Sequence, residues 1–418
     1  MKPKQIQRMI KSALENPSFL KESPVIVIYG SPGCGKSASG FAAAAAAEVP
    51  ADELNKYYKT DEYTGVIKPH VYYASMISTD VLEWGGTPFP VDARGVPAFT
   101  STEGPFFTAR AISTMLPPPG HREPCMFLID DFFAGDSLTQ RKCLQLLDEK
   151  VSTAPGIGDY RLPELCLRVM TTNTREDIDF FQVFRPVVTR AIHVKFESDI
   201  NHWLEWATDA DVHAVIRSYL RQNPDKLNMY DPNLPPENSY PCERVWGSIV
   251  NGVFKLFYRE YESFCHGGDS SVLADMEELI IEALGKGENS IGPHFMAYVR
   301  LGNEVTPMVD IYEKADKAKI PSNPAVVYLT LSMAVDGVRK MTKDDLDKIR
   351  NLCDYMCRVA DSGSGYVNQE IVSFALSALT RIIIRHDGAG NPEKRIIPLD
   401  TRDFTTKVNR KVRSVSNG

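Results

Sequence analysis

The chain has 418 residues, of which 43% are hydrophobic, 24% charged and 10% aromatic. This composition excludes collagen, coiled coil and disorder as the main architecture, and the length allows two or three domains. The balance of 47 basic against 54 acidic side chains gives a net charge of −7. A general affinity for nucleic-acid phosphates is therefore disfavoured, although a local basic groove stays open.

The eight cysteines are scattered, and several lie in apolar runs, so we expect reduced packing residues. Only Cys353 and Cys357 stand close together, and a second pair of zinc ligands is lacking. The first residues do not resemble a secretory signal, and no apolar run has the length of a membrane span. These features predict no membrane partner and a cytoplasmic location, which would be the host cytoplasm for a viral protein.

The first predicted element is an amphipathic helix at residues 3–14, which places its apolar side chains on one face. Apolar runs of strand length then alternate with helix-like stretches as far as residue 196. The expected strands are 25–29, 71–74, 126–129, 167–171 and 191–196, and the expected helices are 37–48, 105–116 and 138–149. This alternation predicts an α/β fold with a mostly parallel sheet that is covered on both faces.

Beyond residue 196 the apolar spacing is helical, apart from a proline-rich connection at residues 223–241. The last stretch is basic and is either a solvated tail or an arm that binds a partner. The predicted division is an N-terminal helix (1–22), an α/β core (23–198), a helical lid (199–310), a C-terminal helical region (311–386) and a basic tail (387–418).

A glycine-rich segment follows the first predicted strand and opens the next helix. It reads Gly30, Ser31, Pro32, Gly33, Cys34, Gly35, Lys36, Ser37. Glycines let backbone N–H groups turn toward a phosphate, and the helix N-terminus adds a positive dipole end. The pattern predicts that Lys36 neutralises the terminal phosphates and that Ser37 binds Mg²⁺, with Cys34 as a spacer. The alternative is an ordinary glycine-rich turn.

A pair of carboxylates ends the apolar strand at residues 126–129. Asp130 is the expected Mg²⁺-side carboxylate, and Asp131 is the candidate base that orients the attacking water. The alternative for this pair is capping of the helix that follows. Together with the glycine-rich segment, the pair predicts a site for ATP and Mg²⁺.

Residues 20–310 resemble the AAA+ ATPases, and within them the MoxR-like branch that is common in bacteriophage genomes. Beyond the two motifs above, residues 158–163 resemble the hairpin that precedes the sensor 1 strand of the family, which places Asn173 at the sensor 1 position. The family usually has Asp-Glu where this chain has Asp130 and Asp131. That departure implies slower hydrolysis or a shifted water geometry.

The resemblance also implies two arginines that act on the nucleotide. Arg190, in a stretch before the last core strand, matches the arginine finger that one subunit donates to its neighbour, with Arg185 in reserve and a surface ion pair as the alternative. Arg244, at the start of a helix, matches sensor 2 or is simply exposed. His193 is expected to pack in the core. Trp84 or Phe89 would face a central pore or pack internally.

The function that the resemblance implies is that of an ATP-driven remodeller, which forms a homo-oligomeric ring of hexameric size and acts on a client protein. A von Willebrand factor A-type protein is one candidate partner. A DNA-directed motor and a nucleotide-gated scaffold with little hydrolysis are alternatives. The net negative charge weighs against a DNA-directed motor, and so does the lack of a run of basic residues interleaved with aromatic ones. The match to sensor and finger positions weighs against a monomeric kinase.

Overall fold

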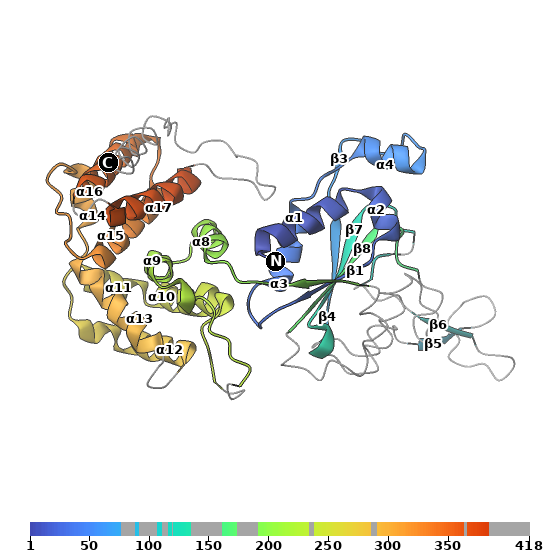
Figure 1. Cartoon of the computed structure of the whole chain (residues 1–418), viewed down its shortest axis with the longest axis horizontal. Coiled ribbons are helices and arrows are strands. Elements are labelled where there is room, and N and C mark those ends of the chain that lie inside the picture. Colours follow the sequence, from blue (N-terminus) through green and yellow to red (C-terminus); the bar gives the residue numbers. More distant parts are fainter. Residues whose placement is uncertain are drawn as a thin grey trace. The chain divides into compact units, whose positions relative to one another are not determined.

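The computed structural model describes residues 1–76, 88–91, 107–110, 116–118, 120–134, 161–173, 191–233, 238–285, 291–362 and 366–383. It divides into two compact units, Met1–Ser198 and Asp199–Gly418, whose elements are labelled in Figure 1. Each unit has its own hydrophobic core. The finer division of the chain into five segments stays a prediction.

The first unit contains a five-stranded parallel sheet, which confirms the predicted α/β class. Its strands lie in the order β4, β7, β8, β1, β9. Their bounds are β1 (Val25–Tyr29), β4 (His70–Ser75), β7 (Cys125–Asp130), β8 (Cys166–Thr172) and β9 (Ala191–Lys195). The strands are parallel, so all their carboxyl ends meet at one edge of the sheet, where ligands of such folds bind.

Helices cover the sheet on the face where α3 lies. The α-helices among the described residues of this unit are α1 (Pro3–Leu14), α2 (Pro17–Glu22), α3 (Lys36–Ala45) and α4 (Ala51–Tyr58). Figure 1 shows α1 and α3 side by side, and their apolar side chains share one core with those of β1, β7 and β8. At Gly40, α3 lies directly against the sheet: a Cβ there would be in ordinary van der Waals contact with the Leu128 side chain, at 3.5 Å.

Two short antiparallel pairs complete the described part of this unit: β2 (Val49–Pro50) with β3 (Val66–Ile67), and β5 (Pro88–Val91) with β6 (Phe107–Arg110). The prediction of a helix over residues 105–116 was therefore wrong at β6. Its residues pair with β5, and tertiary strand pairing overrides a weak helical spacing. The helix predicted at residues 138–149 lies outside the described residues.

Strand β9 differs from the expected doubly covered strand because it lies at the edge of the sheet. The side chains of Ile192 and His193 are exposed there, while Val194 is buried. The prediction that His193 packs in the core was therefore wrong. An apolar run of strand length indicates a strand, but its place in the sheet decides how many of its faces are covered.

The second unit is helical and contains two adjoining cores. The first is built by α8 (Ile200–Asp209), α9 (Ala214–Gln222), the π-helix η4 (Val245–Val250), α10 (Asn251–Leu256), α11 (Tyr258–Cys265), α12 (Ala274–Leu284) and α13 (Ile291–Val299). The second is built by α14 (Met308–Glu313), α15 (Pro324–Gly337), α16 (Leu346–Asp361) and α17 (Tyr366–Ile383). Cys353 and Cys357 are buried in this second core.

Short 3-10 helices connect several elements of the two units: η1 (Phe132–Ala134), η3 (Pro224–Lys226), η5 (Ser270–Leu273), η6 (Arg300–Glu304), η7 (Val338–Lys340) and η8 (Lys343–Asp345). In the described part of the chain, no helix is both long and apolar enough to cross a membrane.

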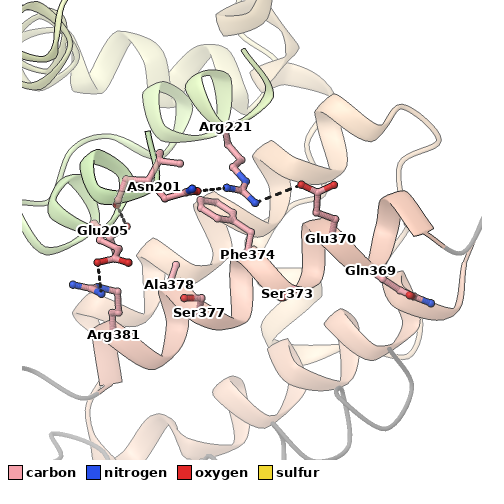
Figure 2. A pocket seen from close by; sticks show the side chains of 12 residues that line it. Asn201, Glu205, Arg221, Gln369, Glu370, Ser373, Phe374, Ser377, Ala378 and Arg381 are labelled. Atoms are coloured by element: carbon pink, nitrogen blue, oxygen red, sulfur yellow. Dashed lines mark hydrogen bonds and ion pairs between the residues drawn. The ribbon is translucent and has the colours of Figure 1, made fainter. Parts of the chain in front are cut away.

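The two cores of the second unit are joined by packing and by ion pairs. Leu329 of α15 belongs to the first core, and Phe374 of α17 packs against both. Between α8, α9 and α17 lies a cavity of about 490 Å³. Figure 2 shows the polar contacts around this cavity: Arg221 with Asn201 (2.8 Å) and Glu370 (3.4 Å), and Arg381 with Glu205 (3.4 Å).

Candidate nucleotide-binding site

The glycine-rich segment forms the turn between β1 and α3, at the carboxyl edge of the sheet. Gly33 and Gly35 have φ angles of 74° and 95°, a backbone conformation that residues with a Cβ rarely adopt. Gly35 is the N-cap of α3. The turn therefore presents its backbone at the positive end of the helix, as anion binding requires.

Lys36 is the first residue of α3, and its side chain is only 6% exposed. Its ammonium donates to the carbonyl oxygens of Gly30 (3.1 Å) and Ser31 (2.9 Å) and to Oδ1 of Asn173 (3.2 Å). Asn173 directly follows β8, which neighbours β1 in the sheet. The predicted phosphate-binding lysine and the predicted sensor 1 residue are thus in contact although 137 positions separate them.

Ser37 and Asp130, the two residues predicted to bind Mg²⁺, also meet. The Ser37 hydroxyl donates to Oδ1 of Asp130 at 2.5 Å. The hydroxyl of Thr171 donates to the same oxygen. Hydroxyl and carboxylate oxygens are the ligands that Mg²⁺ prefers, and the ion keeps several water molecules in such sites. This donor set fits Mg²⁺ bound to a nucleotide.

Tyr73 contacts the other oxygen of this carboxylate. Its phenol hydroxyl donates to Oδ2 of Asp130 at 3.0 Å, and its ring packs against Phe41 of α3 at a centroid distance of 5.4 Å. Burial and the negative charge of Asp130 raise the pKa of Tyr73, so the phenol keeps its proton at neutral pH. No local sequence pattern links Tyr73 and Thr171 to Asp130, because only the pairing of β4, β7 and β8 brings these residues together.

Asp131 has a left-handed backbone with φ of 49°. Its N–H donates to Oδ1 of Asp130 (3.2 Å) and lies 3.4 Å from the Thr171 hydroxyl oxygen. The chain therefore turns sharply at the end of β7. Asp131 leaves the strand directly beside the Asp130 carboxylate, and its role as a base for the attacking water stays a prediction.

The remaining predicted residues are placed only in part. Cys34 is buried in the core behind the loop, in keeping with a spacer. Arg190, Arg185 and Trp84 lie outside the described residues, as do residues 158–160 of the expected hairpin, and the side chain of Phe89 in β5 is not described either. Arg244 is exposed at the start of the helix that continues into η4, and its role toward the nucleotide stays a prediction.

The sheet, the loop between β1 and α3 and the helical second unit together define the fold. It is an α/β P-loop NTPase fold with a helical C-terminal region, as predicted. No family model matches the chain, and no curated protein does either.

Two solved structures illustrate what the chain is similar to. One is a protein of Cytophaga hutchinsonii to which an ATPase activity has been ascribed, with 13% identity over 67% of this chain and 80% of that chain, and a TM-score of 0.29. The other is PCH-2 of C. elegans, with 11% identity over 71% of this chain and 67% of that chain, and a TM-score of 0.25. Both TM-scores are below 0.5, so we infer nothing about activity or assembly from them.

Proposed function

We propose that the chain is a Mg-ATP-dependent AAA+ ATPase of the MoxR-like branch. One observation supports the proposal above all: at the carboxyl edge of the sheet, two neighbouring residues of α3 each make a hydrogen bond to a predicted site residue from another strand end, Lys36 to Asn173 and Ser37 to Asp130. A phosphate-binding turn, a Mg²⁺-type oxygen pair and a neutral amide at the same place suit hydrolysis of a nucleoside triphosphate.

In the proposed reaction each of these residues has a separate task. Backbone N–H groups of the glycine-rich turn and the Lys36 ammonium hold the phosphates. Mg²⁺, when bound with ATP, neutralises charge on the phosphate oxygens. Ser37 and Asp130 hold it in place. Asp131 accepts the proton of the attacking water, and Asn173 orients that water without adding charge.

We further propose that the protein works as a ring, of hexameric size by resemblance, and acts on a client protein. Arg190 of one subunit would then stabilise the phosphoryl group bound to its neighbour, so that hydrolysis depends on assembly. A von Willebrand factor A-type protein is the candidate partner that the resemblance offers. A phage origin would agree with the same resemblance.

A pair of variants tests the ATPase proposal. Lys36→Ala is expected to lose both nucleotide binding and turnover, since it removes the buried ammonium. Asp131→Asn is expected to bind Mg-ATP as the wild type does but to turn over about 100-fold more slowly or worse, because the base is lost. Fluorescent ATP binding and phosphate release measure the two effects. Asp61→Asn, an exposed acid in a loop, is the control.

A nucleotide-gated scaffold is the second candidate, and the aspartate at position 131 favours it. Aspartate is one methylene shorter than the glutamate that the family usually has there, so the base would reach less far toward the water. Under this reading, wild-type protein binds ATP with no more turnover than Asp130→Ala. Turnover clearly above that control, with no stimulation by single- or double-stranded DNA, supports the remodelling ATPase instead.

A further inference from the structure

The carboxylate of Asp130 is held on both of its oxygens by side chains from three elements, α3, β8 and β4. Oδ1 accepts from Ser37 and Thr171, whereas Oδ2 accepts from Tyr73 of β4 at 3.0 Å. A carboxylate has about four lone-pair positions, and hydrogen bonds to its two oxygens fix the rotation of the group. Among the described residues, the phenol of Tyr73 is the contact that sets the direction of Oδ2.

The sheet register explains why Tyr73 reaches this oxygen. Ser75 pairs with Asp130, and Tyr73 pairs with Leu128, two residues before Asp130 on β7. Side chains two residues apart in a strand lie on the same face, so Tyr73 and the Asp130 carboxylate share one face of the sheet. That face is covered by α3, whose Phe41 packs on the Tyr73 ring. The ring contact holds the phenol in place although both rings are 40% exposed.

We propose that Tyr73 is a positioning residue for Mg²⁺, which orients the Asp130 carboxylate through its phenol hydroxyl. The inference rests on the proposed function and deepens it, because it names a residue that governs metal affinity rather than nucleotide affinity. Groups that hydrogen-bond a metal-side carboxylate typically change metal affinity or activity by 10- to 100-fold when removed. Lys36 and the glycine-rich turn, which hold the phosphates, do not contact Tyr73 in the described hydrogen bonds.

Tyr73→Phe tests the inference, since it removes the hydroxyl and keeps the ring that packs on Phe41. Tyr72→Phe is the matched control on the same strand. Tyr72 points to the opposite face of the sheet, where it packs against His121, so its hydroxyl cannot act on Asp130. Both variants lose one phenolic oxygen from β4, and equal thermal unfolding curves would show that both are folded.

The measurement is binding of a fluorescent ATP analogue as a function of free Mg²⁺. In Tyr73→Phe the Mg²⁺ concentration for half-maximal binding is expected to rise about 10-fold, while binding without Mg²⁺ is unchanged. Tyr72→Phe is expected to titrate as the wild type does. A Tyr73→Phe curve that coincides with the wild-type curve overturns the inference alone. A wild-type protein that binds no nucleotide overturns the proposed function and the inference together.

Discussion

Asp131 stands at the point where the chain departs from the AAA+ pattern, and its backbone offers a reason. Its φ of 49° lies in the left-handed region, which aspartate and asparagine adopt more readily than other residues with a side chain. A glutamate there would have the longer reach but the less suitable backbone preference. The residue type at this position thus agrees with the sharp turn after β7.

His213, at the N-terminus of α9, is held in its neutral form. Its ring stacks on Phe254 at 4.4 Å, and its Nδ1 accepts from the N–H of Val215 at 3.4 Å. Desolvation by burial, and then the nearby positive charge of Arg217, lower the pKa of His213 to about 3, against a smaller opposing effect of Asp211. Protonation would disrupt the cap and place a charge beside Arg217.

The lowered pKa of His213 predicts a loss of stability in acid. Because the unfolded chain binds this proton below about pH 6.5 and the folded chain does not, the free energy of unfolding falls as the pH drops from 6.5 toward 3. His213→Asn keeps a good helix cap and cannot be protonated. Between pH 6.5 and 5, the free energy of unfolding of this variant should therefore fall by about 2 kcal/mol less than that of the wild type.

Urea unfolding at pH 7.5, 6.5 and 5 measures this difference. His266→Asn, which changes an exposed histidine of the same unit, is the control and should follow the wild type. An equal fall in the free energy of unfolding of the wild type and of His213→Asn between pH 6.5 and 5 would contradict the prediction.

At the scale of the elements, the second unit depends on an ion pair between its two cores. Arg217 of α9 is 1% exposed, and its guanidinium donates to Asp336 of α15, to the carbonyl oxygen of Val212 (2.8 Å) and to the hydroxyl of Thr208 (3.2 Å). Arg339 of η7 joins the same network through Asp336 at 3.5 Å. These contacts tie α8 and α9 to α15.

Removal of the carboxylate from this network is expected to destabilise the second unit strongly. Asp336→Ala leaves the buried guanidinium of Arg217 without its counter-charge, which costs about 3 kcal/mol or more. Asp347→Ala breaks an exposed pair with Arg350 (2.9 Å) in the same unit and should cost less than about 1 kcal/mol. Urea midpoints measure both. Equal effects of the two variants would show that the network does not hold the cores together.

At the scale of the whole molecule, the proposed ring predicts a site shared between copies. Arg190→Ala and Lys36→Ala should each be inactive alone, because one lacks the finger and the other the phosphate-binding lysine. When the two are mixed, some interfaces combine an intact Arg190 with an intact Lys36. ATPase activity should therefore reappear and be highest at an intermediate ratio, as measured by phosphate release.

The control for this mixing experiment is the same titration with Arg185→Ala in place of Arg190→Ala. Rescue only with the Arg185 variant would move the finger to that residue. Absence of rescue with either variant, at every ratio, would contradict a ring in which the nucleotide lies between neighbouring copies.

The sequence by itself determined the α/β class, the five strands of the parallel sheet and the glycine-rich turn, because these depend on local patterns: apolar runs, glycine spacing and acids at a strand end. Lys36, Ser37 and Asp130 could be named for the same reason. The prediction of a helix was wrong at residues 107–110, because their pairing with β5 outweighed the helical spacing of their apolar side chains. The exposure of His193 follows from the edge position of β9, which no local pattern encodes.

Only the tertiary structure decided which side chains surround Asp130. Tyr73 and Thr171 lie 57 and 41 positions from it along the chain, and they belong to two other strands. They meet the carboxylate because β4, β7 and β8 are neighbours in register. Contacts across a sheet depend on strand order, and strand order results from the packing of the whole unit rather than from any short segment.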